Sequence, residues 1–130
     1  MPEIPRDPVP PKFFGKDHWS TFGYIECRVV DNGGLINNQH MRCDPKRHPG
    51  LAHIPWRNGD IPTRLQGGVK LPKHDDWDCF YDLEAAGLLK DESTGIRPRV
   101  ILTKLGHSVA ARLREHKASG GSFASFTWEG

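Results

Sequence analysis

The stretch HDDWDCFYDLEAAGLLKD, residues 74–91, decides the predicted fold of the C-terminal half of this chain. Large side chains recur with helical spacing at positions 77, 80 or 81, 84 and 88, so that they share one face. Asp75 or Asp76 is suited to cap the start of a helix, and Gly87 is suited to end it. The pattern therefore predicts a helix that runs directly into a β-strand.

The charged side chains of this predicted helix are all acidic. They are Asp75, Asp76, Asp78, Asp82 and Glu84, and no Lys or Arg lies among residues 75–88. Such a helix would be repelled by duplex DNA, which carries one negative charge per roughly 1.7 Å of helix axis. We therefore expect these five carboxylates to bind a protein or nucleoprotein partner that presents a basic surface.

Two strands and a helix are expected after this helix, and a short helix is expected before it. Residues 89–102 indicate a strand, a turn with its tip at residues 93–95, and a second strand. Thr103 is suited to cap a following helix. Upstream, the segment IPTRLQGG at residues 61–68 fits a short helix that the Gly pair would end. The apolar stripe of the last helix would be formed by Leu105, Val109 and Leu113.

This order of elements over residues 60–117 resembles the second half of bacterial winged-helix domains of the MarR and PadR kind. In those domains a helix runs into the phrase dLeaaGLL, a two-stranded wing follows, and V-x-LTxxG starts the next helix. The resemblance implies an α+β fold with a C-terminal winged-helix-like unit. The whole chain resembles small uncharacterised bacterial or mobile-element proteins, including those of phages. The matching residues are Asp82, Leu83, Glu84, Gly87, Leu88, Leu89, Val100, Leu102, Thr103 and Gly106.

Basic side chains in the predicted wing and last helix support an alternative function. In DNA-binding winged helices the wing often grips phosphates while the preceding helix reads bases. A DNA-binding transcriptional regulator is therefore an alternative to a protein-binding one. The residues expected to contact nucleic acid are Arg97, Arg99, Lys104, Arg112 and Arg114.

The N-terminal half is predicted to contain a β-hairpin. The five prolines in residues 1–12 favour an extended arm. Residues 22–30 are rich in aromatic and β-branched side chains, and DNGG at 31–34 favours a turn before a returning strand. The alternative is a helix capped by Asp17. One face of that helix would hold Trp19, Phe22 and Ile25.

A Pro-rich loop after this hairpin holds side chains of the types that bind metals. Imidazole and thiolate ligands suit tetrahedral zinc, and a metal cross-link would stabilise a polar loop. A zinc-stabilised protein or a zinc-dependent enzyme is therefore a further alternative, with the neighbours Asp17–His18 and residues 74–76 as acid–base groups. The predicted ligands are His40, Cys43, His48 and His53.

The composition of the chain bounds these hypotheses. Its 130 residues suit one domain after the arm, expected over 13–130, with the hairpin and His/Cys loop at 13–59, the winged-helix-like unit at 60–118 and a tail at 119–130. The net charge of +2 excludes a strong general attraction to nucleic acid or membranes. Three cysteines do not predict a disulfide framework. A cytoplasmic location is expected, because no apolar run approaches the roughly 18 residues of a membrane span.

The leading expectation is thus a small non-enzymatic binding or regulatory protein, with no catalytic residue assigned.

Overall fold

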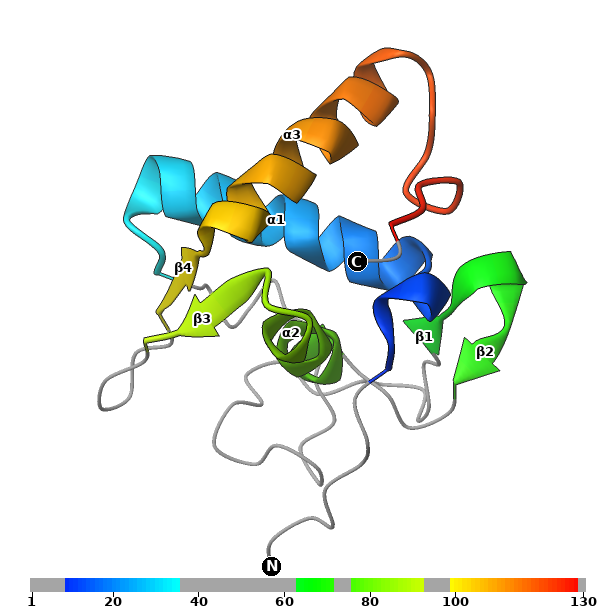
Figure 1. The fold of residues 1–130 in the computed structure, drawn as a ribbon, viewed down its shortest axis with the longest axis horizontal. Coiled ribbons are helices and arrows are strands. Elements are labelled where there is room, and N and C mark those ends of the chain that lie inside the picture. The colour runs from blue at the N-terminus through cyan, green and yellow to red at the C-terminus, as the bar shows by residue number, and fades with distance from the viewer. Residues whose placement is uncertain (1–8, 36–62, 72–75, 93–98, 129–130) are drawn as a thin grey trace, which may run out of the picture.

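The computed structural model describes residues 9–35, 63–71, 76–92 and 99–128 (Figure 1). The described part has helices and two small antiparallel sheets, so the α+β class is confirmed. None of the helices in these ranges has the length and apolar character needed to cross a bilayer. The α-helices are α1 (Lys16–Asn32), α2 (Asp76–Ala85) and α3 (Lys104–Ala118). The strands are β1 (Thr63–Arg64), β2 (Lys70–Leu71), β3 (Leu89–Asp91) and β4 (Val100–Leu102), and the 3-10 turns are η1 (Pro11–Phe13) and η3 (Gln66–Gly68).

The predicted N-terminal hairpin is wrong, because its first strand lies inside α1. The DNGG segment that indicated a hairpin turn is the end of this helix, where Gly33 adopts the left-handed conformation at φ 63°. Its backbone N–H donates to the carbonyl of Arg28. A left-handed glycine serves a helix C-terminus as well as a hairpin turn, so the local signal did not distinguish the two.

The buried face of α1 explains why the helix wins over the strand. His18, Phe22 and Ile25 follow each other at helical spacing, and each side chain is fully buried. Trp19 is buried beside them. As a strand, the same segment would place half of these side chains on the opposite face, so only the helix puts them into one core. The start of the helix is capped by Gly15 and not by Asp17.

The C-terminal elements follow the sequence-based prediction. β3 and β4 form an antiparallel ribbon in which Leu89 lies opposite Leu102. Thr103 caps α3 by accepting a hydrogen bond from the N–H of Gly106 at 2.9 Å. The predicted apolar stripe needs one correction, since Leu105 is 45% exposed. The buried residues of α3 are Gly106, Val109, Ala110 and Leu113.

A glycine allows α3 to lie directly against the chain that enters the ribbon. A Cβ atom at position 106 would overlap the backbone of Leu88. The start of α3 is further held there because the hydroxyl of Thr103 donates to the carbonyl of Gly87 at 2.5 Å. The glycine of the LTKLG segment thus sets the distance between the helix and the ribbon.

The short helix expected near residues 61–68 is not formed in the described part of that segment. Thr63 and Arg64 pair instead with Leu71 and Lys70 as a small antiparallel hairpin, closed by the turn η3. Gly67 has a φ of 79° inside this turn. The Gly pair that was expected to end a helix therefore closes a hairpin, because glycine permits both conformations.

After α1, the chain joins the outer edge of the β3–β4 ribbon. Leu35 forms an antiparallel bridge with Arg99, and the N–H of Val100 donates to the carbonyl of Gly34 at 2.9 Å. Glu92 pairs with the opposite side of Arg99, donating its N–H to the carbonyl at 2.8 Å. The β4 segment therefore has a chain on each side.

The core lies between the three α-helices. α1 contacts both α2 and α3, and Figure 1 shows these two helices on opposite sides of it. The C-terminal tail packs back onto the domain, since Phe126 meets Trp19 edge to face with ring centroids 4.8 Å apart. The main core residues are Phe14, Trp19, Phe22, Ile25, Trp77, Phe80, Leu83, Leu88, Val100, Val109, Leu113 and Phe126.

Candidate functional site

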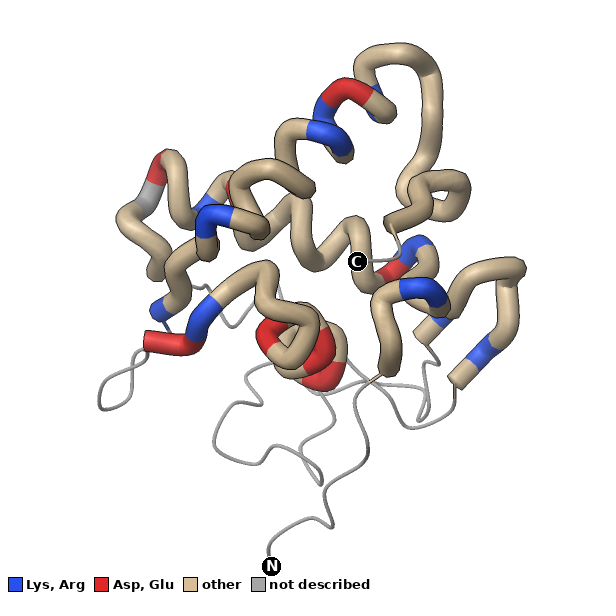
Figure 2. The backbone as a smooth tube through the Cα atoms, viewed as in Figure 1, with Lys and Arg blue, Asp and Glu red and all other residues tan. Residues whose placement is uncertain are grey.

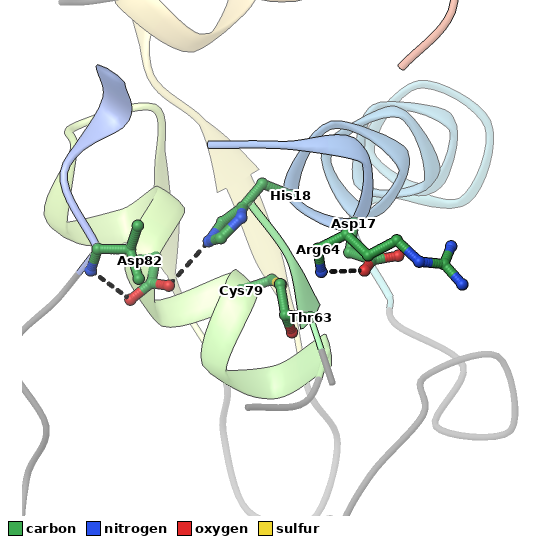
Figure 3. A network of polar contacts seen from close by, with 7 residues as sticks. Asp17, His18, Thr63, Arg64, Cys79 and Asp82 are labelled. Atoms are coloured by element: carbon green, nitrogen blue, oxygen red, sulfur yellow. Dashed lines mark hydrogen bonds and ion pairs between the residues drawn. The ribbon is translucent and has the colours of Figure 1, made fainter. Parts of the chain in front are cut away.

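The inward face of α2 carries two of the carboxylates that the sequence placed on a partner-binding surface. Asp76 and Asp82 are only 8% and 6% exposed. One oxygen of Asp82 lies 2.9 Å from Nε2 of His18, and the other accepts the backbone N–H of Val9 at 3.2 Å (Figure 3). Asp82 therefore joins α2 to α1 and to the N-terminal segment, and it is not part of an exposed face.

The imidazole of His18 is held on its face as well as at its edge. The ring of Phe14 stacks on it with centroids 4.3 Å apart and an interplanar angle of 7°. The histidine is fully buried. Stacking and the bond to Asp82 together fix the ring, so His18 orients the packing of α1 on α2.

A second carboxylate links α1 to the small hairpin. Asp17 accepts the backbone N–H of Arg64 at 2.6 Å (Figure 3). Next to this contact the hydroxyl of Thr63 lies 3.9 Å from the sulfur of Cys79 on α2. Asp17 and His18 are neighbours in the chain, but they bind different elements, so they do not form an acid–base pair.

The thiol of Cys79 is held in its neutral form. Burial raises the pKa of Cys79 well above its usual range, and the nearby carboxylates of Asp76 and Asp82 raise it further. A reactive cysteine needs a depressed pKa and access to solvent, whereas this side chain is fully buried. The polar cluster around Cys79 is therefore built for packing, and the chemistry of a cysteine nucleophile is not available to it.

Sequence reasoning did not find the pairing of His18 with Asp82. If residues 17–27 are read as a helix, His18 lies one turn before Phe22 in the apolar stripe, and this position indicates a buried histidine. A histidine inside such a stripe needs a polar partner, because burying an unpaired polar group is costly. The identity of the partner was not readable, since it lies 64 residues away in the chain.

The outward face of α2 keeps a smaller acidic surface than expected. Tyr81 is 39% exposed, and Asp78 and Glu84, each three residues from it, are half-buried. One oxygen of Glu84 accepts the backbone N–H of Asp91 at 2.7 Å. Asp75 lies outside the described residues. We call the group of Asp78, Tyr81 and Glu84 the α2 ridge.

The basic residues expected to contact nucleic acid are exposed but dispersed. Arg112 and Arg114 project about 160° apart around the axis of α3, because they are two residues apart in the helix. Arg114 forms an ion pair with Glu26 at 2.6 Å, and Arg99 donates through Nε to the carbonyl of Gly33 at 3.1 Å. Figure 2 shows Lys and Arg positions scattered over the described elements. Several acidic positions lie together on α2, and others lie on α1, at the end of β3 and on α3. Arg97 lies outside the described ranges.

The predicted zinc ligands fall outside the part of the chain that the structure describes. His40, Cys43, His48 and His53 all belong to residues 36–62. Among the described residues, no group of three or more His, Cys, Asp or Glu side chains is arranged to hold a metal ion. Zinc binding by these four residues stays a prediction.

Comparison with known proteins found no match to a family model, to a curated protein or to a solved structure.

Proposed function

We propose that this protein is a small non-enzymatic binding protein on a winged-helix-like scaffold, and that the α2 ridge contacts a protein or nucleoprotein partner. The observation that carries the proposal is the exposed ring of Tyr81 between Asp78 and Glu84 on a helix without Lys or Arg. Exposed tyrosines are frequent centres of binding energy at protein interfaces. Flanking carboxylates select a partner of opposite charge.

The order of elements supports the winged-helix-like scaffold. α1, α2, the β3–β4 ribbon and α3 come in this order, with the β1–β2 hairpin between α1 and α2 where the resemblance implied a short helix, and Leu35 joins the free edge of β4 through Arg99. In a winged helix that reads DNA, α2 would occupy the position of the groove-binding helix. Its negative charge makes a basic protein surface the better partner, because duplex DNA would repel it.

An affinity experiment with the full-length chain tests this function. The immobilised wild type is expected to retain a basic protein from lysate of the source cells, and Tyr81→Ala is expected to weaken retention by about tenfold or more. Ile101→Ala is a matched control, because Ile101 is also 39% exposed but lies on β4. Equal retention of every captured protein by wild type, Tyr81→Ala and Ile101→Ala would contradict the proposal.

A second candidate function is DNA binding, because the described basic residues are all exposed. They are Arg99, Lys104, Arg112 and Arg114. In this function, the ribbon and α3 contact the DNA backbone and the protein regulates transcription. Binding to duplex DNA should then weaken steeply as salt is added, in proportion to the number of phosphates contacted. Arg112→Ala should reduce both the affinity and this salt dependence. An absence of DNA binding at low salt would remove this alternative.

A further inference from the structure

An apolar pocket lies between α1 and α3, on the side of α1 away from α2. Its volume is about 470 Å³, within the range of pockets that hold small molecules. The apolar part of its wall includes Gly23, Tyr24 and Cys27 of α1 together with Leu113 of α3. The tail closes one side, because the ring of Phe123 lies against Gly23, where a Cβ atom would meet it at 3.5 Å.

Three charged side chains surround this apolar wall. Arg114 and Lys117 of α3 and Glu26 of α1 line the pocket, which leaves one positive charge in excess. Arg114 is bound to Glu26 at 2.6 Å, yet its side chain is 61% exposed. A guanidinium has five N–H donors, so the pair with Glu26 leaves donors for a second acceptor. The ammonium of Lys117 lies over the ring of Phe123, 4.2 Å from the centroid, and therefore at the edge of the apolar wall.

We infer that this pocket binds a small apolar carboxylate, with its hydrocarbon or aromatic body between α1 and α3 and its carboxylate at Lys117 and Arg114. Burial of the apolar body of such a molecule against the apolar wall lowers the free energy of the complex. The excess positive charge supplies the counter-ion, and a charge-assisted hydrogen bond is stronger than one between neutral groups. An apolar amine would meet the same two cations, and Glu26, the carboxylate of the pocket wall, is already paired with Arg114.

The pocket is separate from the α2 ridge, so this inference does not depend on the proposed function. The packing of α2 involves the opposite side of α1, where His18 meets Asp82. A failure of the pocket to bind a carboxylate would leave the partner-binding proposal intact, and the reverse also holds.

Calorimetric titration of the full-length protein with 2-naphthoate tests the inference. We expect a Kd below about 1 mM, which corresponds to a favourable free energy of about 4 kcal/mol. Its neutral analogue 2-naphthylmethanol is expected to bind at least about fivefold more weakly, because it lacks the charge that Lys117 and Arg114 recognise. No binding at millimolar 2-naphthoate, or equal affinity for the two compounds, would overturn the inference.

Two pocket variants and one control variant locate the binding site. Lys117→Met keeps the length of the side chain but removes its charge, and should weaken 2-naphthoate binding about fivefold. Lys16→Met is the matched control, since Lys16 is exposed on α1 and does not line the pocket, and should leave the affinity unchanged. Cys27→Phe places a ring in the pocket from an exposed position of α1 and should abolish binding. Unchanged affinity in Cys27→Phe, or equal losses in the two lysine variants, would overturn the assignment.

Discussion

The two ends of α1 carry the same kind of contact in opposite surroundings. Near its start, His18 meets Asp82 at 2.9 Å with both side chains buried. In its second half, Glu26 meets Arg114 at 2.6 Å, and the arginine side chain is 61% exposed while that of Glu26 is 13% exposed. The N···O distances of the two contacts are similar, but the solvent around them differs. Coulomb interactions are weakened by water at the exposed end and much less at the buried end.

Two cysteines show the same contrast in exposure. Cys79 is fully buried beside Thr63 and Asp82, whereas Cys27 is exposed on the last turns of α1. The buried end therefore holds groups whose loss leaves polar atoms stranded in the core. The exposed end holds groups whose loss water can compensate.

The largest effect is expected from Asp82→Ala. Removing this carboxylate takes the acceptor from the N–H of Val9 and the partner from Nε2 of His18, so the free energy of unfolding should fall by about 2–5 kcal/mol. Denaturant unfolding followed by tryptophan fluorescence measures this loss. Asp82→Asn is the control, because it keeps an acceptor at the site and should be the less damaging change. A loss below about 1 kcal/mol in Asp82→Ala would show that the buried pair is no stronger than a surface one.

Cys27 should react with a thiol reagent about a hundredfold or more faster than Cys79. Cys27 needs no opening of the structure to react, whereas Cys79 reacts only when its part of the core opens. Two variants that each retain one of these cysteines, both with Cys43→Ser, allow the rates to be measured separately with a chromogenic disulfide reagent. Comparable rates at neutral pH would mean that the core around Cys79 opens easily, and the contrast would not hold.

A smaller effect is expected from the titration of Cys79. Its pKa is raised in the folded protein by burial. Above about pH 8.5 the unfolded chain loses the thiol proton while the folded chain retains it. This contribution is complete at lower pH, and stability should fall by up to about 1.4 kcal/mol per pH unit above that value.

The pH dependence of denaturant midpoints tests this slope. Cys79→Ser removes the titrating group and should flatten the loss between about pH 8.5 and 10 relative to the wild type. Cys27→Ser should retain the wild-type slope, because that thiol is exposed at the other end. Parallel curves for all three proteins would show that burial of Cys79 does not govern the alkaline loss.

The smallest effect is expected from Arg114→Ala at the exposed end. An ion pair with an exposed partner contributes about 1 kcal/mol or less, and added salt screens it. The loss in unfolding free energy should therefore shrink in high salt, as measured by the same denaturant method. A salt-independent loss as large as that of Asp82→Ala would erase the difference between the two ends.

Local sequence patterns were sufficient for α2, the β3–β4 ribbon and α3. Asp76 to Ala85 shows helical spacing of its large side chains, and Gly87 with a φ of 82° ends that run. Thr103 supplies a cap that is readable without any tertiary contact. Each of these elements contains both its periodicity and its stop signal, so nearby residues determine it.

The same reasoning failed for α1 and for the small hairpin at β1 and β2. Glycines follow or interrupt both segments, and a glycine with positive φ fits a helix end, a hairpin turn or a 3-10 turn equally well. The choice was made by burial, since only the helical form of α1 brings His18, Phe22 and Ile25 into one core. The exposed face of α2, which forms the candidate site, could not be predicted from local sequence either, because it depends on where α1 packs.

The sequence by itself determined the acidic character of α2, its apolar positions and the caps of the C-terminal elements. Only the tertiary structure decided that Asp82 faces inward to His18 while Tyr81 stays exposed on the outward side. The physical reason is that every face of an isolated helix is exposed to water, so a carboxylate is equally well solvated on any of them. It enters a core only where another element supplies donors to replace water, and those donors come from residues 64 and 73 positions away in the chain.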